Sequence, residues 1–491
     1  MRLLEWAREQ GLEASGCEVD VTDVTCDSRE AGPGWAFVAL RGETVDGADF
    51  VPQVLAQGAR AILAERSLTL PEGVAFVRIP EGRAVMAELA REVYGRPDTR
   101  LALVGVTGTN GKTTTTMLMR QLLSRMGVGC GLIGTVELAA GHQVQEATRT
   151  SPESPVFYRW LRRSAEAGDA ALAIEVSSHA LCLNRVRGAR FRVGCFTNLT
   201  QDHLDYHGTM EAYFEAKARL FEQCDRGLVN VDDEAGRRLA AQGLATFAVE
   251  HPADYRAEAI QLSPTGTRFR LVAPTGGYDV ESPLLGRFNV YNLLAALASL
   301  AEAGFPLADL VGAVPAVKGA PGRLERVDVG QPFGVMVDYA HTPDALEKLL
   351  AAGKDLLPAG GRLHVLFGCG GDRDRTKRPL MAEAVAGGAD VLWHTSDNTR
   401  KEDPERILDD AAVGIPEPLR ADPTRYHRIT DRALAVAAAL ADCRPGDLLL
   451  LAGKGHEPYQ DIQGVKHPYS DRGAVEAILK GQPVPRPWAR D

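Results

Sequence analysis

The chain has 491 residues, of which 45% are hydrophobic and 24% are charged, and its formal net charge is −10. This length predicts about three domains with a large buried core, and the acidic balance argues against nucleic acid as the main partner. The eight cysteines are scattered without Cys-x-x-Cys spacing, which indicates reduced thiols rather than a zinc site or a disulfide framework. The N-terminus begins an amphipathic helix and no apolar run reaches membrane-spanning length, so we expect a cytoplasmic protein without membrane insertion.

The first 97 residues mix short strands with short helices. Strands are predicted at 36–40, 61–64 and 74–79, and helices at 50–57 and 83–93. Taken alone, the loop around Ser28 and the turn-rich loop at 42–47 are interpreted as solvated turns.

Residues 104–116 join a predicted buried strand to a helix with one apolar face. The glycines let backbone N–H groups approach phosphate oxygens, and the helix N-terminus adds its positive dipole end. The lysine that follows can bind phosphate, and the next hydroxyl can ligate Mg²⁺. Val106 departs from the strict phosphate-loop pattern, which wants a small residue there, and the alternative is an ordinary Gly-rich turn. We predict an ATP site formed by Gly108, Thr109, Asn110, Gly111, Lys112, Thr113 and Thr114.

Two further strand ends carry candidate metal ligands. A predicted strand at 171–176 contains Glu175, and a strand at 193–197 runs into a loop that contains His203. The carboxyl ends of parallel strands meet at one edge of a sheet, so both side chains are expected beside the phosphate loop. Lys217 lies on a predicted helix at 211–221, where residue type alone suggests a solvated surface charge.

A Gly- and Pro-containing segment at 318–322 is the best linker candidate, and beyond it strands and helices alternate, which predicts a second parallel sheet. Four of its strand ends lead into polar loops, at 338–343, 368–374, 396–400 and 453–457. The fold class is therefore predicted as α/β with three domains: a small N-terminal α/β domain at 1–97, a central P-loop-type domain with a parallel sheet at 98–321, and a C-terminal Rossmann-like domain at 322–491.

Six motifs together resemble the Mur ligase family, and the similarity covers nearly the whole chain. They are Gly-Thr-Asn-Gly-Lys-Thr-Thr, Glu-Val-Ser-Ser-His-Ala-Leu, Thr-Asn-Leu-Thr-Gln-Asp-His-Leu-Asp-Tyr-His-Gly, Asp-Tyr-Ala-His-Thr-Pro-Asp, Gly-Cys-Gly-Gly-Asp-Arg-Asp and Ala-Gly-Lys-Gly-His-Glu.

This resemblance implies a reaction of cytoplasmic peptidoglycan precursor synthesis, and hence a part in cell-wall formation, cell shape and division. ATP would phosphorylate a carboxylate of UDP-N-acetylmuramoyl-L-alanyl-D-glutamate, and the amine of a diamino acid would displace phosphate to give an amide. Mg²⁺ is the implied cofactor, ATP is a substrate, and a monomer is expected.

The resemblance also assigns residues by position. The nucleotide contacts would include Asn292, Arg323, Asp338 and His341. Lys112, Thr113, Glu175 and His203 would serve the phosphates and metals, and Lys217 matches a lysine that is carbamylated in the family and would meet the metal as an anion. The uridine-diphosphate and peptide ends of the substrate would contact Cys26, Ser28, Glu43, Thr44, Val45, Thr150, Ser151, Ser177 and Arg185, while Leu183 stands where many relatives place a glutamine.

The loop Asp397-Asn398-Thr399-Arg400 matches the family's acceptor-selecting motif. Arg400 could form a bidentate pair with the distal carboxylate of meso-2,6-diaminopimelate, a group that L-lysine and L-ornithine lack. Arg373, Gly453 and Glu457 match the remaining acceptor contacts. Thr399 replaces the usual proline, so diaminopimelate is favoured while L-ornithine and L-lysine stay as alternatives.

Two rival interpretations remain from the sequence. Other Mur ligases and folylpoly-γ-glutamate synthase share the ATP domain but not the acceptor loop. A P-loop NTPase switch would hydrolyse ATP without any amino acid, and the polar loops of the third domain would then have no assigned task.

Overall fold

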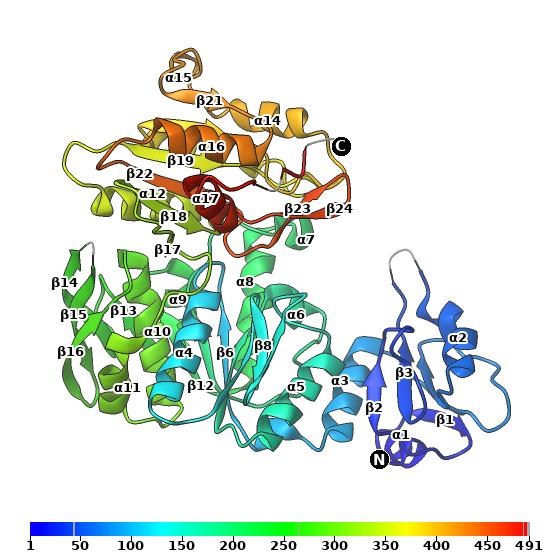
Figure 1. Cartoon of the computed structure of the whole chain (residues 1–491). Coiled ribbons are helices and arrows are strands. Elements are labelled where there is room, and N and C mark those ends of the chain that lie inside the picture. The colour runs from blue at the N-terminus through cyan, green and yellow to red at the C-terminus, as the bar shows by residue number, and fades with distance from the viewer. Residues whose placement is uncertain (43–44, 264, 485, 489–491) are drawn as a thin grey trace.

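The structure is a computed structural model that describes residues 1–42, 45–263, 265–484 and 486–488. Three sheets and one separate hairpin follow each other along the chain, and Figure 1 shows them as three bodies, each combining helices with strands. The predicted α/β class with three parts is confirmed. None of the helices in the described ranges is long and apolar enough to cross a membrane.

The N-terminal sheet has five strands in the order β1-β5-β4-β3-β2, with β1 antiparallel and the others parallel. The predicted strands and helices of this region are confirmed to within one residue at each end. The two strands that were not predicted, β1 and β2, are only four and three residues long. The elements are α1 (Leu3–Glu9), β1 (Glu13–Gly16), β2 (Asp23–Thr25), β3 (Trp35–Ala39), α2 (Val51–Ala56), β4 (Ala61–Ala64), β5 (Ala75–Arg78) and α3 (Gly82–Val93).

The N-terminal sheet is tied to the central one by a continuous apolar core. Leu4 and Tyr94 belong to the same buried cluster as Phe157 and Trp160 of α5 (Ser154–Glu166), and Figure 1 shows α3 and α5 at the junction. Burial of this apolar surface stabilises the contact. It fixes the position of the N-terminal loops relative to the central sheet.

The central sheet has eleven strands in the order β16-β15-β14-β13-β12-β11-β6-β10-β7-β8-β9. Neighbouring strands are parallel from β14 to β7, whereas the pairings at both ends of the sheet are antiparallel. The prediction of a parallel sheet is therefore right for the centre and wrong for the edges, where short turns join successive strands as hairpins. The strands are β6 (Ala102–Thr107), β7 (Cys130–Ile133), β8 (Glu137–Ala140), β9 (Gln143–Glu146), β10 (Ala171–Glu175), β11 (Phe191–Phe196), β12 (Cys224–Asn230), β13 (Ala245–Ala248), β14 (Tyr255–Ser263), β15 (Gly266–Ala273) and β16 (Gly276–Ser282).

The order β11-β6-β10 confirms that the three strands expected to lead into the ATP site are neighbours. Because they are parallel, their carboxyl ends share one edge of the sheet. The helices of this part, besides α5, are α4 (Lys112–Arg125), α6 (Ser178–Cys182), α7 (Leu204–His207), α8 (Met210–Ala218), α9 (Glu234–Ala240), α10 (Arg287–Glu302) and α11 (Leu307–Ala313), with a 3₁₀ turn at Arg219–Gln223.

The C-terminal sheet has the order β17-β18-β22-β19-β20-β21 and is parallel except for the edge strand β17. The predicted alternation of strands and helices is confirmed, while β17, α15, β21, the β23–β24 hairpin and α17 were not predicted. The elements are β17 (Glu325–Arg326), β18 (Gly334–Asp338), α12 (Pro343–Leu356), β19 (Leu363–Phe367), α13 (Lys377–Gly388), β20 (Val391–His394), α14 (Pro404–Ala412), α15 (Glu417–Arg420), β21 (Tyr426–Arg428), α16 (Arg432–Asp442), β22 (Leu448–Ala452), β23 (Tyr459–Ile462), β24 (Val465–Pro468) and α17 (Asp471–Leu479).

A buried ion pair attaches the last helix to this sheet. Arg432 Nη2 lies 2.6 Å from Asp471 Oδ2, and both side chains are fully buried. The same guanidinium donates to the backbone oxygens of Ala452, at 2.8 Å, and Ser396, at 3.4 Å. Arg432 therefore joins α17 to the ends of two central strands.

Candidate active site

The predicted phosphate loop lies between β6 and α4, as expected. Gly108 and Gly111 have φ values of +143° and +89°, and a Cβ atom on Gly108 would stand 1.9 Å from Thr197 Oγ1. No other residue fits at Gly108 without moving the neighbouring strand end. Lys112 Nζ donates to the backbone oxygens of Gly108, at 2.9 Å, and Thr109, at 2.8 Å, so the ammonium lies over the loop.

Oxygen atoms gather beside the start of α4. Thr113 Oγ1 donates to Glu175 Oε2 at 2.9 Å, and Thr135 donates to the same carboxylate through its backbone nitrogen, at 2.7 Å, and its hydroxyl, at 3.1 Å. Glu175 is buried, and both of its carboxylate oxygens accept hydrogen bonds from these groups. A buried carboxylate next to a hydroxyl is a donor set that suits a hard divalent cation such as Mg²⁺.

His203 lies in a group of aromatic rings at the start of α7. Its ring centroid is 5.0 Å from that of His179 and 6.1 Å from that of Tyr213, and Nε2 lies 3.4 Å from Asp202 Oδ2. Burial lowers the pKa of His203 to about 4, which keeps the imidazole neutral at pH 7. Across the residues that the structure describes, no three His, Cys, Asp or Glu side chains form a group that could hold a metal.

Lys217 is not a solvated surface charge, contrary to what its residue type suggested. The side chain is 1% exposed, Nζ donates to Gly108 O at 2.7 Å, and it stands 4.4 Å from the centroid of the Tyr213 ring. Burial lowers the pKa of Lys217 well below its ordinary value, and the nearby cation of Lys112 lowers it further. The structure thus brings a buried amine to the phosphate loop.

The residues matched to the nucleotide lie on both sides of the loop. Asn292 lies close against Gly111, since a Cβ atom on that glycine would be 2.5 Å from Asn292 Oδ1. Arg323 Nη2 reaches Thr113 Oγ1 at 3.5 Å, and its guanidinium stands 4.6 Å from the ring centroid of Tyr339 in the C-terminal part. The carboxylate of Asp338 accepts the backbone N–H groups of Leu324, at 2.6 Å, and Ala340, at 2.7 Å, and His341 bonds Tyr339 O through Nδ1 at 2.7 Å.

The four residues matched to the peptide end of the substrate form one group. Ser151 Oγ donates to Glu175 O at 2.8 Å and lies 3.2 Å from Ser177 Oγ, while Arg185 Nη1 donates to Ser151 O at 3.1 Å. Thr150 Oγ1 lies 3.0 Å from Thr135 Oγ1. Neither Thr150 nor Ser151 caps α5, which begins after Glu153.

Glu153 is a residue that the sequence analysis missed. Its carboxylate makes ion pairs with Arg83 of the N-terminal part, at 2.6 Å, with Arg149, at 3.0 Å, and with Arg185, at 2.8 Å. Burial, with the Glu153 charge as the next cause, raises the pKa of Cys26 to about 11. The Cys26 loop and the peptide group are therefore neighbours.

The remaining residues matched to uridine diphosphate are less well defined. Ser28 is partly buried, and Val45 is 50% exposed. Glu43 and Thr44 lie outside the described residues. Leu183 ends α6, where its backbone N–H donates to His179 O at 2.8 Å.

The residues matched to the acceptor lie at the ends of β20 and β22. Asp397, Asn398 and Thr399 are buried, and Asn398 Nδ2 donates to Glu457 Oε2 at 2.8 Å. A Cβ atom on Gly453 would lie 3.0 Å from Asp397 Oδ2. These loops bring one set of polar residues together, which we call the acceptor recess and define by Asp397, Asn398, Arg400, Gly453, Lys454 and Glu457.

The two arginines matched to the acceptor differ in position. Arg400 has a φ of +51° and its Nη1 donates to Gly371 O at 2.6 Å, so its side chain crosses to the neighbouring loop. Arg373 is exposed, and within the part of the chain that the structure describes its side chain donates only to Asp372 O, at 3.1 Å. The structure brings Arg400, and not Arg373, to the buried loops.

Three sequence models of Mur ligase domains match this chain. They are the Mur ligase family catalytic domain at residues 20–94, the Mur ligase middle domain at 106–300, and the Mur ligase glutamate ligase domain at 322–455. A curated relative, the UDP-N-acetylmuramoyl-L-alanyl-D-glutamate--2,6-diaminopimelate ligase of Geobacillus thermodenitrificans, is 44% identical and covers 95% of this chain and 96% of its own. The chain belongs to the Mur ligase family.

Other comparisons agree with this family. The enzyme of the same name from Streptomyces coelicolor is 44% identical over 98% of this Mur ligase and 97% of its own chain. A solved structure of a ligase with that name is 36% identical, with a TM-score of 0.66, and the match covers 94% of this chain and 95% of that one. The MurF ligase of Thermotoga maritima in complex with ADP is 18% identical, covers 89% of this chain and 94% of its own with a TM-score of 0.64, and supports the fold alone. This Mur ligase is therefore an ATP-dependent ligase.

The central and C-terminal parts of this Mur ligase are in contact through the phosphate loop. Asn110 Nδ2 donates to Asp344 Oδ2 at 2.8 Å, and Thr200 Oγ1 lies 3.5 Å from the same oxygen. Lys377 Nζ is 3.6 Å from Asp202 Oδ1. The ATP site and the acceptor-bearing part therefore meet directly.

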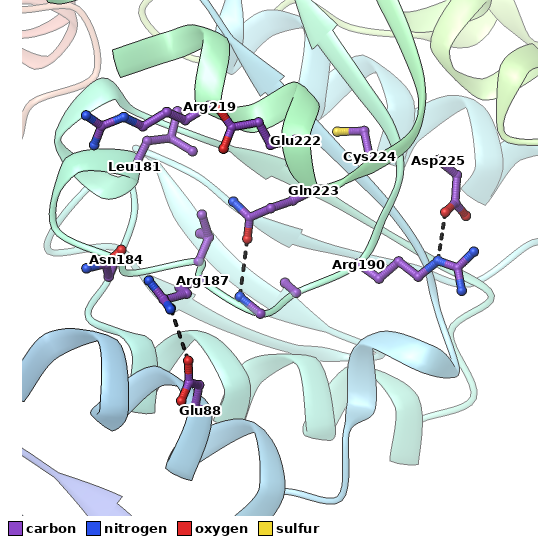
Figure 2. A pocket seen from close by; sticks show the side chains of 13 residues that line it. Glu88, Leu181, Asn184, Arg187, Arg190, Arg219, Glu222, Gln223, Cys224 and Asp225 are labelled. Carbon is purple, nitrogen blue, oxygen red and sulfur yellow. Dashed lines mark hydrogen bonds and ion pairs between the residues drawn. The ribbon is translucent and has the colours of Figure 1, made fainter. Parts of the chain in front are cut away.

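A separate polar hollow of about 740 Å³ lies between α3, the loop after α6 and the 3₁₀ turn after α8. Figure 2 shows Arg187 directed toward Glu88 and Arg190 toward Asp225 in this hollow. It contains none of the predicted site residues. Its charged groups are largely paired with one another, so we leave it outside the candidate site.

Lys454 and Asp344 were also missed as individual residues. Both stand in motifs that carry the family resemblance, Ala-Gly-Lys-Gly-His-Glu and Asp-Tyr-Ala-His-Thr-Pro-Asp. Nothing in those motifs says that one side chain is buried and the other crosses to the phosphate loop, because both facts depend on tertiary contacts.

Proposed function

We propose that this enzyme joins meso-2,6-diaminopimelate to UDP-N-acetylmuramoyl-L-alanyl-D-glutamate at the expense of ATP. The observation that carries the proposal is the 44% identity, over nearly the full length of both chains, to curated relatives with that activity in their names. The proposal includes Mg²⁺ as cofactor and a monomer that works in cytoplasmic synthesis of peptidoglycan precursors.

The reaction needs a carboxylate to be made electrophilic. Transfer of the γ-phosphoryl group to a carboxylate oxygen of the peptide gives an acyl phosphate and ADP. The acceptor amine then attacks the acyl carbon, the carbon–oxygen bond to phosphate breaks, and the nitrogen loses a proton to leave an amide and inorganic phosphate. Positioning and charge stabilisation supply most of the catalysis in such transfers.

The phosphate loop supports the first step. Backbone N–H groups of the loop and the N-terminus of α4 would bind the phosphates, with Lys112 as a mobile cation. Thr113 and Glu175 would hold Mg²⁺, whose charge, when bound, offsets that of the phosphate oxygens. Asn292, Arg323, Asp338 and His341 would contact the nucleotide.

Lys217 is suited to modification by carbon dioxide. Only a neutral amine attacks CO₂, and burial favours that form. The new nitrogen–carbon bond and the loss of a proton give an anionic carbamate, which would face the metal site together with His203. An unmodified ammonium at this position would repel the cation.

The substrates would occupy the two sides of this centre. Ser151, Ser177 and Arg185, with Thr150, would bind the peptide carboxylates, and the Cys26 loop would bind the uridine-diphosphate end. In the acceptor recess, Arg400 would pair with the distal carboxylate of diaminopimelate and Glu457 with its ammonium. Asp397, Asn398, Thr399 and Gly453 would shape the recess, with Arg373 at its exposed rim.

The test is phosphate release from purified enzyme with ATP, Mg²⁺ and UDP-N-acetylmuramoyl-L-alanyl-D-glutamate, adding meso-diaminopimelate, L-lysine or L-ornithine in separate reactions. We expect release that depends on the peptide substrate and is greatest with diaminopimelate. A preference for lysine or ornithine would keep the ligase and overturn the acceptor, with Thr399 as the first residue to exchange. Release that is indifferent to every amino acid would support the NTPase switch instead.

A further inference from the structure

Lys454 is a fully buried lysine at the centre of the acceptor recess. Its Nζ atom lies 2.9 Å from Glu457 Oε2, 3.0 Å from Asn398 Oδ1 and 3.4 Å from Asp397 Oδ1. The side chain is 0% exposed. One ammonium therefore contacts three residues that are matched to the acceptor.

The backbone on both sides of Lys454 fixes this arrangement. Gly453 and Gly455 have φ values of +108° and +52°, a region that other residues rarely adopt. From the opposite side, Gln460 Nε2 donates to Asp397 O at 3.0 Å and the backbone N–H of Asp461 donates to Asn398 Oδ1 at 2.8 Å. The ammonium is held in one position by both loops.

The charges of the acceptor recess are balanced. Its two carboxylates, Asp397 and Glu457, are matched by two cations, Lys454 and Arg400. Burial by itself would raise the pKa of Asp397, but the cations of Lys454 and then Arg432 bring it below its ordinary value, so this carboxyl is ionised.

Three other polar side chains near the recess, those of Arg432, Tyr339 and His341, add no unmatched charge. Arg432 is already paired with Asp471. Tyr339 approaches Glu457 Oε1 at 3.5 Å with a neutral hydroxyl, and burial lowers the pKa of His341, which keeps its ring neutral at pH 7.

We propose that Lys454 is a specificity-determining residue, whose buried ammonium makes the recess electrically neutral and so selects an acceptor with a zwitterionic distal end. This inference rests on the proposed function, because diaminopimelate carries both an ammonium and a carboxylate at that end. Lys454 and Asn398 both donate to Glu457 Oε2, whereas Oε1 has a longer contact of 3.5 Å with the Tyr339 hydroxyl and can still accept from the substrate ammonium. A lone ammonium, as in lysine or ornithine, would bring an unmatched positive charge into a buried site, and a lone carboxylate would bring an unmatched negative one.

The first test uses the wild-type enzyme and needs no variant. Values of kcat/KM are compared for meso-diaminopimelate, L-lysine and 2-aminopimelate, which keeps the distal carboxylate but lacks the distal amine. A neutral recess predicts that diaminopimelate exceeds both others by about tenfold or more. Equal use of 2-aminopimelate and diaminopimelate would overturn the inference while leaving the proposed acceptor intact, and preference for lysine would overturn both.

The second test removes the charge. Lys454→Met should lower the ratio of kcat/KM for diaminopimelate over that for lysine by about tenfold or more, because the recess then carries an excess negative charge. Lys454→Arg should keep the ratio within about threefold of the wild type, since the charge is retained. The matched control is Lys401→Met, which removes an exposed lysine next to Arg400 and should leave the ratio unchanged.

A purely structural role for Lys454 gives a different result. Loss of structure lowers kcat for all acceptors alike, and an unchanged ratio in Lys454→Met would overturn the inference even if total activity falls. If Lys454→Met does not fold, the acceptor series with the wild type and Lys454→Arg decides the question.

Discussion

The central and C-terminal parts each bury a lysine, and the two surroundings are opposite. Lys217 contacts a backbone oxygen and the ring of Tyr213, with a second cation, Lys112, nearby. Lys454 contacts two carboxylates and an amide oxygen. Among the described residues, the lysine side chain makes no ion pair in one region and two ion pairs in the other.

The comparison of the two lysines shows that the surroundings of a buried residue determine its protonation state and therefore its chemical role. Burial without a counter-charge favours the neutral amine, which is a nucleophile, whereas burial beside carboxylates keeps an ammonium that organises its neighbours. Lys217 is therefore suited to the proposed carbamate modification, whereas Lys454 is suited to fix the positions of Asp397, Asn398 and Glu457. Substitutions of the two lysines test this difference.

The largest expected effect is on activity. Lys217→Ala should lower kcat/KM by about 100-fold or more, because the proposed anion at the metal site is lost. Short carboxylic acids such as formate or acetate should restore part of the activity by supplying an anion in the vacated space. Phosphate release in the complete reaction measures both.

Lys112→Ala is the control for this rescue, because it removes a cation and carboxylic acids cannot replace it. Labelling with ¹³C-enriched CO₂ gives an independent readout: a carbamate carbon resonance should disappear in Lys217→Arg and persist in Lys454→Arg. Full activity in Lys217→Ala would refute the carbamate role.

A second prediction concerns stability, measured by urea unfolding in CO₂-free buffer. Lys454→Met should lower the free energy of unfolding by about 3 kcal/mol, because it leaves two buried carboxylates without their cation. Lys217→Met should change it by less than about 1 kcal/mol, since a buried amine without an anionic partner is replaced by an apolar group of similar length. Gly108 O keeps a donor in that variant, from Lys112 Nζ at 2.9 Å.

Equal destabilisation by the two substitutions would contradict the difference between the two lysines, because it would mean that the charge of Lys217 is compensated to the same extent as that of Lys454. Each variant serves as the control for the other, since both exchange a buried lysine for methionine.

The smallest predicted effect is a pH dependence. The pKa of Asp397 is lowered in the folded protein, so at acidic pH the unfolded chain binds more protons at this residue than the folded chain does. The stability that comes from the Asp397–Lys454 pair is therefore present above the ordinary pKa of 3.8 and is lost as the pH falls through the folded pKa. In Lys454→Met the buried carboxyl of Asp397 loses its cation, so protonation of this carboxyl stabilises the folded variant. The stability difference between wild type and Lys454→Met should therefore narrow by about 1 kcal/mol from pH 7 to pH 4.

The Lys217→Met difference should stay constant over the same range, because the nearby carboxylate of Asp202 has a pKa lowered to about 2 and remains ionised. A parallel narrowing for both variants would point to general acid destabilisation instead. Urea unfolding at four pH values is sufficient to separate these results.

Much of the fold could be predicted because local patterns and tertiary structure agree. Buried parallel strands are short apolar runs, such as 102–107 and 448–452, and helices between them have one apolar face. The edges were missed for the opposite reason. Strand β14 pairs in parallel on one side and antiparallel on the other, and the three-residue β21 has no distinctive pattern of its own.

The candidate site was predictable where its residues lie at or just after the ends of predicted strands. Glu175 is the last residue of a buried strand, and the phosphate loop and the 397–400 loop follow buried strands, so their place at the sheet edge follows from topology. Lys217 and Lys454 were not predictable from residue type, because each is buried by contacts with segments far away in sequence. Glu153 is a further case, since its partner Arg83 lies 70 residues earlier.

The pairing of Arg432 with Asp471 has a practical meaning for anyone who shortens this protein. A chain that stops before α17 would leave the Arg432 guanidinium enclosed beneath the ends of β20 and β22 without its ion-pair partner Asp471. Those strand ends lead directly into the acceptor recess. The last helix contributes no residue to the recess but supports the strand ends that lead into it, so we expect a C-terminal truncation to impair the proposed selection of the acceptor amino acid.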